Sequence, residues 1–138
     1  MIQTLNMQDL RQLNLFEKVT RVRTRFCFPY NNQVLFCVPR QFVKMAVGRD
    51  AQNVKRISQV LKKRIKIIPQ PEGIADLKKF VAAIVKPIEF KEIEVKGDEI
   101  ILTAGSQSKA ALIGRNKRRL LEMQKIIKDF FGKEFRIQ

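Results

Sequence analysis

The spacing of apolar residues in the first half of the chain predicts three helices and three strands. Leu10, Leu13 and Phe16 recur at helical spacing, whereas residues 21–28 alternate Arg or Thr with apolar side chains, as a strand does. The expected elements are a helix at 7–18, strands at 21–28 and 33–38, helices at 40–47 and 52–63, and a strand at 65–68. This half therefore reads α-β-β-α-α-β.

The second half repeats this order of elements. Its expected elements are a helix at 74–85, strands at 88–95 and 99–103, helices at 107–113 and 116–131, and a strand at 134–137. Apolar stripes predict the buried faces of the longer helices: Val54, Ile57, Val60 and Leu61 in one half, and Leu120, Met123, Ile127 and Phe130 in the other. Gly132 is suited to end the last helix in a left-handed conformation.

The proline-containing segment 69–73 separates the two halves. Its two prolines exclude a continuing helix or a central strand at this point. We therefore expect one domain over 1–70 and a second over 71–138, joined by this short linker. The expected fold class is α+β, with a three-stranded sheet in each domain.

A glycine followed by arginine marks a sharp corner between the short and the long helix of each half. Gly48 and Gly114 lie 66 residues apart, which indicates a repeat. Glycine lets the backbone turn sharply and approach a ligand closely, and the helix that follows points free N–H groups at an anion. Arginine and lysine beside such a turn add charges that pair with phosphate.

The corners supply the candidate residues for binding a phosphate-bearing partner such as a nucleic acid. In the first half these are Val47, Gly48, Arg49, Asp50, Ala51, Asn53, Val54, Lys55 and Arg56; in the second they are Ile113, Gly114, Arg115, Asn116, Lys117, Arg118 and Arg119. Apolar residues next to each turn, Val47 and Val54 in one half and Ile113 and Leu120 in the other, are expected to line a groove for unstacked bases.

The net charge favours a polyanionic partner. The chain carries 28 Lys and Arg against 13 Asp and Glu, a formal charge of +15. Residues 1–70 hold 14 basic and only 3 acidic side chains, whereas residues 71–138 hold 14 basic and 10 acidic ones. The first half should therefore contribute more of the long-range attraction.

Composition excludes several kinds of chemistry. The absence of His removes the commonest general base and metal ligand, and with it a Ser-His-Asp or Cys-His catalyst. Two Cys cannot complete a structural zinc site without other ligands. Glu89, Glu92 and Glu94 read as a polar strand face, because nothing else catalytic accompanies them. We therefore predict no enzyme activity, no metal and no cofactor.

The chain shows no sign of a membrane segment. Its longest apolar stretches, such as 80–85, fall far short of the roughly 18 residues that a membrane-spanning helix needs. The first residues lack the basic-then-apolar pattern of a signal peptide. We therefore expect a cytoplasmic protein without membrane contact. We also expect the protein to be a monomer.

The first corner resembles the loop of K-homology (KH) domains in NusA-type transcription factors. The segment Gly48-Arg49-Asp50-Ala51-Gln52-Asn53-Val54 is similar to the family's G-x-x-G loop, which is often followed by Gln-Asn-Val. The order α-β-β-α-α-β is that of type II KH domains, so the resemblance covers essentially the whole chain as two tandem domains. It is most similar to the short archaeal NusA-like proteins.

The resemblance implies single-stranded RNA binding in transcription elongation, termination or antitermination, with RNA polymerase or other transcription factors as further partners. Ala51 and Lys117 stand where the family pattern has its second glycine, and a Cβ there disfavours a positive φ. Two alternatives stay open: a ribosome-associated RNA-binding protein, and a protein-binding adaptor whose loops no longer bind RNA.

Two further features carry structural expectations. Arg21, Arg23 and Arg25 are expected on one face of the first strand, as a solvent face or a secondary contact. Cys27 and Cys37 face each other if the turn between the strands centres on Asn32, although two reduced thiols are the expected state in a cytosol.

Overall fold

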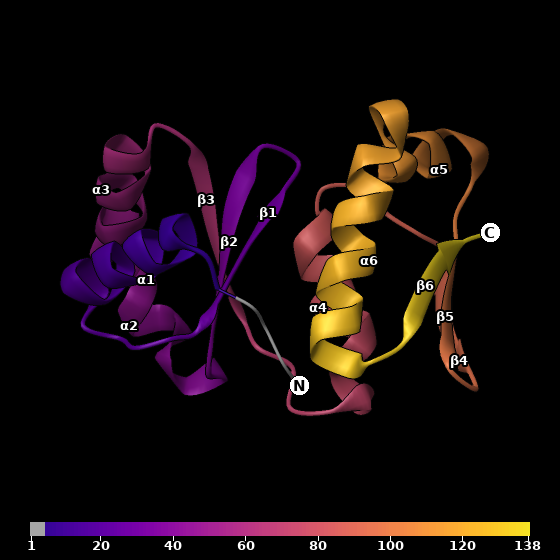
Figure 1. Ribbon diagram of the computed structural model, residues 1–138, viewed down its shortest axis with the longest axis horizontal. Helices are drawn as coiled ribbons and strands as arrows, with labels where there is room; N and C mark the ends of the chain where they lie inside the picture. The colour runs from indigo at the N-terminus through magenta and orange to yellow at the C-terminus, as the bar shows by residue number, and fades with distance from the viewer. Residues whose placement is uncertain (1–4) are drawn as a thin grey trace. The chain divides into compact units, whose positions relative to one another are not determined.

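The structure is a computed structural model that describes residues 5–138. These residues form two compact units, residues 5–70 and Pro71–Gln138 (Figure 1). Each unit contains a three-stranded mixed sheet and three α-helices, so the chain has an α+β fold with the predicted order of elements in both halves. Several helices and strands begin or end at other residues than the sequence patterns predict.

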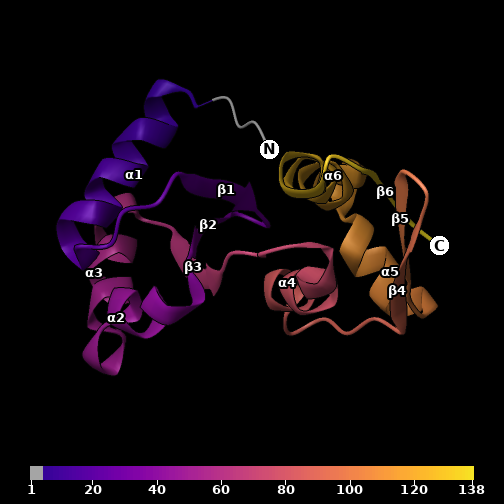
Figure 2. The same ribbon diagram turned by 90° about the horizontal axis from the view of Figure 1, so that it is seen from below.

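The first unit contains α1 (Met7–Thr20), β1 (Phe26–Tyr30), β2 (Gln33–Val38), α2 (Val43–Val47), α3 (Gln52–Leu61) and β3 (Arg64–Pro69). Short 3₁₀ turns, η1 (Arg40–Phe42) and η2 (Arg49–Ala51), precede α2 and α3. The central strand β2 pairs antiparallel with β1 and parallel with β3. The three helices lie on one side of this sheet in both views (Figures 1 and 2).

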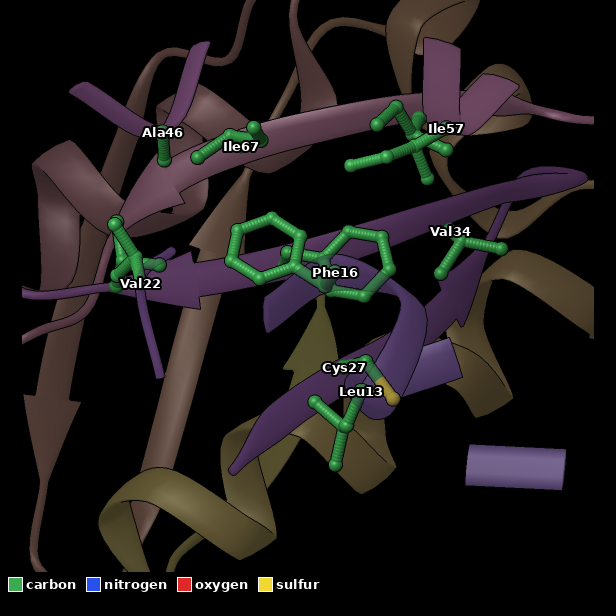
Figure 3. Packing of buried hydrophobic residues seen from close by; sticks show 11 residues of the cluster. Leu13, Phe16, Val22, Cys27, Val34, Ala46, Ile57 and Ile67 are labelled. Carbon is green, nitrogen blue, oxygen red and sulfur yellow. The ribbon is translucent and has the colours of Figure 1, made fainter. Parts of the chain in front are cut away.

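The core of the first unit lies between that sheet and its helices. Phe16 of α1 is fully buried and stacks on Phe36 of β2, with ring centroids 4.4 Å apart. Ile57 of α3 and Ala46 of α2 reach the same cluster (Figure 3). Val60 is instead 59% exposed, so the apolar stripe predicted for α3 is narrower than the sequence suggested.

The second unit repeats this architecture. It contains α4 (Leu77–Val85), β4 (Glu92–Lys96), β5 (Glu99–Thr103), α5 (Ser106–Ile113), α6 (Arg118–Phe131) and β6 (Glu134–Ile137), with η3 (Ile74–Asp76) and η4 (Arg115–Lys117) before α4 and α6. The central strand β5 pairs antiparallel with β4 and parallel with β6. The last helix ends at Gly132 with φ 67°, which confirms the predicted left-handed cap.

The strand predicted over 21–28 begins five residues late. α1 continues to Thr20 and ends at Arg21, whose φ of 65° turns the chain away from helical geometry. The Thr20 hydroxyl donates to the Phe16 carbonyl at 2.7 Å and accepts from the Val22 amide at 3.0 Å. The first alternating residues therefore form the helix cap and an irregular connection, and the strand starts only at Phe26.

The three arginines predicted on one strand face are consequently not on a strand. Arg21 caps α1, while Arg23 and Arg25 lie in the connection that follows. The Arg23 guanidinium pairs with the Glu17 carboxylate at 2.9 Å, on the exposed side of the helix end. The strand predicted over 88–95 is likewise shorter, because β4 begins only at Glu92.

The two thiols lie on opposite faces of the first sheet. The hairpin turn consists of Asn31 and Asn32, both with positive φ, as a two-residue turn of this kind requires. This register pairs Cys27 with Phe36 and Cys37 with Phe26, rather than the cysteines with each other. Adjacent strand residues point to opposite faces. The turn centres between Asn31 and Asn32 and not on Asn32, so the condition under which the thiols would face each other is not met.

Both cysteines are buried thiols that are not joined in a disulfide, as expected from the sequence. Burial raises the pKa of the Cys37 thiol, and the nearby Cys27 raises that pKa further. The thiol of Cys37 is therefore held in its neutral form inside the sheet, where it serves as a small apolar side chain.

One carboxylate in the second unit is placed unfavourably. The Oδ2 atom of Asp129, on α6, is shielded from solvent and has no hydrogen-bond partner among residues 5–138. Desolvation raises the pKa of Asp129, and the positive charge of Lys125 one turn earlier opposes that rise only in part. The folded state therefore prefers the protonated carboxyl more than the unfolded chain does.

We predict that Asp129→Asn stabilises the protein at neutral pH and that this gain disappears in acid. The folded-state pKa lies above the ordinary value of 3.8, so the wild-type carboxyl favours folding below that value and loses this contribution as pH rises through its raised pKa. Thermal unfolding followed by circular dichroism from pH 3.5 to 7 measures the difference between variant and wild type. Asp98→Asn, at an exposed turn, is the control; an equal effect of both variants contradicts the prediction.

Candidate nucleic-acid interface

The corner between α2 and α3 has an unusual backbone that is repeated between α5 and α6. Gly48 has φ 82° and ψ 169°, and Gly114 has φ 75° and ψ 173°. In each corner the second and third residues after the glycine both adopt the left-handed conformation. These residues are Asp50 and Ala51 in the first unit, and Asn116 and Lys117 in the second.

Matching hydrogen bonds close the two corners. The Gly48 amide donates to the Lys44 carbonyl at 3.1 Å, and the Gly114 amide donates to the Ala110 carbonyl at 3.0 Å. Three residues later the Ala51 amide donates back to Gly48 at 3.2 Å, and the Lys117 amide does the same to Gly114 at 3.2 Å. The two corners are therefore the same structural device, built from different side chains.

A side chain from the following helix fastens each corner. Asn53 Nδ2 donates to the carbonyl oxygen of Ala46 at 3.1 Å, and Arg119 Nη1 donates to that of Ala111 at 2.9 Å. Asn53 and Arg119 both stand five residues after the corner glycine. Their primary role in the structure is thus to join two helices, and these polar groups are already engaged.

The same two side chains explain why the corners need glycine. A Cβ on Gly48 would lie 2.9 Å from Asn53 Nδ2, and one on Gly114 would lie 3.0 Å from Arg119 Cγ. Both glycines also have positive φ, which L-amino acids with a side chain rarely adopt. The close contacts and the positive φ therefore both require glycine at positions 48 and 114.

The first corner borders a surface groove of about 440 Å³. Four of the predicted binding residues line it: Arg49, Asp50, Lys55 and Arg56. Gln52 and Gln59 complete its lining and were missed by the sequence analysis. A spacing of i, i+3, i+4 and i+7 places Gln52, Lys55, Arg56 and Gln59 on one face of α3. This spacing could have identified the two glutamines from the sequence.

The remaining predicted residues of the first corner serve mainly as framework. Val47 and Val54, expected to line an apolar groove, are half-buried and pack against the core cluster of the first unit. Gly48 and Ala51 supply backbone geometry. Among the residues predicted for the first corner, Arg49, Asp50, Lys55 and Arg56 therefore combine exposure with a place on the groove.

The second corner presents a row of exposed cations. Arg115, Lys117 and Arg118 are exposed around Asn116, whereas Arg119 is half-buried by its contact with α5. Ile113 and Leu120 are half-buried beside them. The arrangement suits the pairing of guanidinium and ammonium groups with phosphate oxygens.

Residues 5–138 contain no side-chain cluster of the kind that holds metal ions and no helix of the kind that crosses membranes. No group of three or more His, Cys, Asp or Glu side chains among them is arranged to hold a metal ion. None of their helices combines the length and hydropathy of a membrane-spanning segment.

Fold and corners together define a two-unit α+β protein with a basic helix corner in each unit. No family model matches the chain. Two curated archaeal proteins are similar to the chain in sequence, and both are described as "Probable transcription termination protein NusA". The protein from Methanococcus vannielii is 30% identical over 100 residues, which cover 71% of this chain and 56% of that protein. The protein from Methanocaldococcus jannaschii is 26% identical over 128 residues, which cover 90% and 68% respectively.

The chain is thus homologous to archaeal NusA, as its first corner predicted. It spans a little over half the length of the first of these relatives. A solved structure described as "Crystal structure of APE1850" covers 97% of this chain and is itself covered completely, with a TM-score of 0.66 and 20% identity. That likeness supports the fold.

We predict that Ala51→Gly and Lys117→Gly each stabilise the fold by about 0.5–1 kcal/mol. The left-handed conformation costs a residue with a Cβ about 1–2 kcal/mol, and the greater freedom of glycine in the unfolded chain offsets part of the gain. Chemical denaturation monitored by circular dichroism measures both variants. Gly48→Ala is the opposite control and should destabilise the protein; stabilisation by that change would refute the explanation.

We predict that Asn53→Ala lowers the free energy of unfolding of the first unit by about 1–2 kcal/mol. The substitution removes a side-chain donor that bridges α3 to the last turn of α2. Arg119→Ala should act in the same way on the second unit. The exposed Gln59 on the same helix is the control, and Gln59→Ala should change stability by less than about 0.5 kcal/mol.

Proposed function

We propose that the two units are type II KH domains and that the chain is a NusA-type transcription factor that binds single-stranded RNA. The observation that carries this proposal is the duplicated glycine corner, which presents exposed cations in both units. Homology to archaeal NusA supports a role in transcription termination, elongation or antitermination. The chain acts by binding, without catalysing a reaction.

In the proposed mechanism, the two glycine corners bind the phosphates of the RNA. Arg49 in the first unit, and Arg115 and Lys117 in the second, reach solvent from backbone segments whose conformation is fixed by the hydrogen bonds described above. A fixed backbone presents these cations without a large loss of conformational freedom on binding. Single-stranded RNA suits such a surface, because its unpaired bases can follow an uneven path while the phosphates remain accessible.

Charge gives the interaction its expected range and its sensitivity to salt. The first unit carries few acidic residues to oppose its cations, so it should attract RNA from a distance. Neutralising about five phosphates gives a slope of roughly −3.5 in a plot of log affinity against log salt. RNA polymerase or another transcription factor is the proposed further partner.

We predict that replacing Arg49, Arg115 and Lys117 together by Ala weakens binding of single-stranded RNA by about tenfold or more at physiological salt and makes the salt slope shallower. Fluorescence anisotropy with short single-stranded RNA, duplex RNA and single-stranded DNA across a salt series measures both quantities. A matched variant in which Lys18, Lys78 and Lys79, exposed on α1 and α4, become Ala removes the same charge elsewhere.

Equal losses in the two triple variants would reduce the interaction to net charge and would contradict a role for the corners. Preference for duplex RNA would favour a ribosome-associated protein that binds structured RNA. Absence of binding by the folded wild-type protein would favour an adaptor that binds other proteins.

A further inference from the structure

The groove beside the first corner lies on the outer face of α3. Gln52, Lys55, Arg56 and Gln59 occupy one side of this helix, opposite the side from which Ile57 enters the core. This face is thus separate from the half-buried Val47 and Val54, which were expected to accommodate bases. Arg49 and Asp50 extend the groove from the helix to the corner itself.

The chemistry of this groove is more varied than phosphate binding requires. Three cations suffice to hold a phosphodiester, yet a carboxylate and two amides share the same lining. The Asp50 carboxylate is exposed, and no residue in the described part of the chain donates a hydrogen bond to it or pairs with it. A carboxylate among phosphate-binding cations repels phosphate. A hydrogen bond that the carboxylate accepts from another part of the ligand can offset this repulsion.

Nucleobases with an exocyclic amino group carry such a donor. Adenine presents its N6 amino group and cytosine its N4 amino group, whereas uracil has a carbonyl oxygen at the corresponding position. A carboxylate accepts a hydrogen bond from an amino group and is repelled by a carbonyl oxygen. Glutamine amides both donate and accept, so they can pair with the remaining polar atoms of a base edge.

We propose that the α3 groove is a nucleotide subsite that selects bases with an exocyclic amino group over uracil. The inference rests on the proposed RNA binding and adds a rule of base preference to it. Arg49, Lys55 and Arg56 hold the flanking phosphates, and Asp50 accepts a hydrogen bond from the base amino group. Gln52 and Gln59 contact the rest of the base edge.

The second unit lacks the features that this subsite needs. The residues that align with Asp50, Lys55 and Arg56 at the repeat distance of 66 are Asn116, Leu121 and Glu122. Leu121 is 59% exposed and contributes no charge, and Glu122 reverses the charge of its counterpart. Base discrimination therefore belongs to the first unit, and the second unit contributes phosphate contacts through its corner.

The test compares eight-nucleotide oligo(A), oligo(C) and oligo(U) with wild type and Asp50→Asn. The wild type should bind oligo(A) and oligo(C) about tenfold more tightly than oligo(U). The variant should lose most of that preference, chiefly through tighter binding of oligo(U). Asparagine tolerates the left-handed conformation of residue 50, as Asn116 does in the second corner, so folding is preserved.

Glu122→Gln is the matched control, because it removes one negative charge at the corresponding helix of the second unit. It should raise affinity for all three oligonucleotides equally and leave their ratio unchanged. Gln52→Ala and Gln59→Ala should weaken binding of oligo(A) and oligo(C) more than that of oligo(U).

The outcomes separate this inference from the function on which it rests. Binding of all three oligonucleotides with equal affinity, or a preference that Asp50→Asn leaves intact, overturns the subsite while RNA binding stands. Failure of the wild type to bind any of the three overturns the proposed RNA binding and the subsite with it. Equal changes of the ratio in Asp50→Asn and Glu122→Gln also overturn the subsite, because long-range charge would then explain the preference.

Discussion

The parallel pairing of two strands in each unit is the constraint on which the rest of the structure depends. Strands β2 and β3 run in the same direction, as do β5 and β6, so the chain must return along the sheet between them. It returns through two helices, which must meet at an abrupt corner. A glycine with positive φ and two left-handed residues make that corner, and Asn53 or Arg119 fastens it. The surface proposed to bind RNA is thus a consequence of strand topology.

The two units use one backbone solution with different side chains. The corners match residue for residue in conformation, yet Ala51 and Asn53 of the first correspond to Lys117 and Arg119 of the second. The amide of Asn53 and the guanidinium of Arg119 fill the same structural role, because each can donate a hydrogen bond to a carbonyl of the preceding helix. Residue type alone therefore does not distinguish a cation that binds a ligand from one that supports the fold.

This ambiguity is visible in the predictions made from the sequence. Arg119 and Asn53 were expected at the interface because of their position after the glycine, but their side chains join two helices. Gln52 and Gln59 were overlooked because uncharged polar residues on an exposed helix face are common. Likewise, alternation at 21–28 resembled a strand, although the cap at Arg21 and the connection after it occupy most of that segment and β1 begins only at Phe26. Local patterns cannot reveal which groups a neighbouring element will engage.

The sequence by itself determined the α+β class, the order of elements in both halves and the positions of the two corners, because helical and strand periodicities, turn residues and glycines act over a few neighbouring positions. It also carried the relationship to archaeal NusA, through the residues of the first corner. Only the tertiary structure decided that Cys27 and Cys37 lie on opposite faces of a sheet, that Asn53 and Arg119 fasten the corners, and which polar residues share a groove. Each of these depends on strand register or on helix packing, where a shift of a single residue reverses the direction of a side chain.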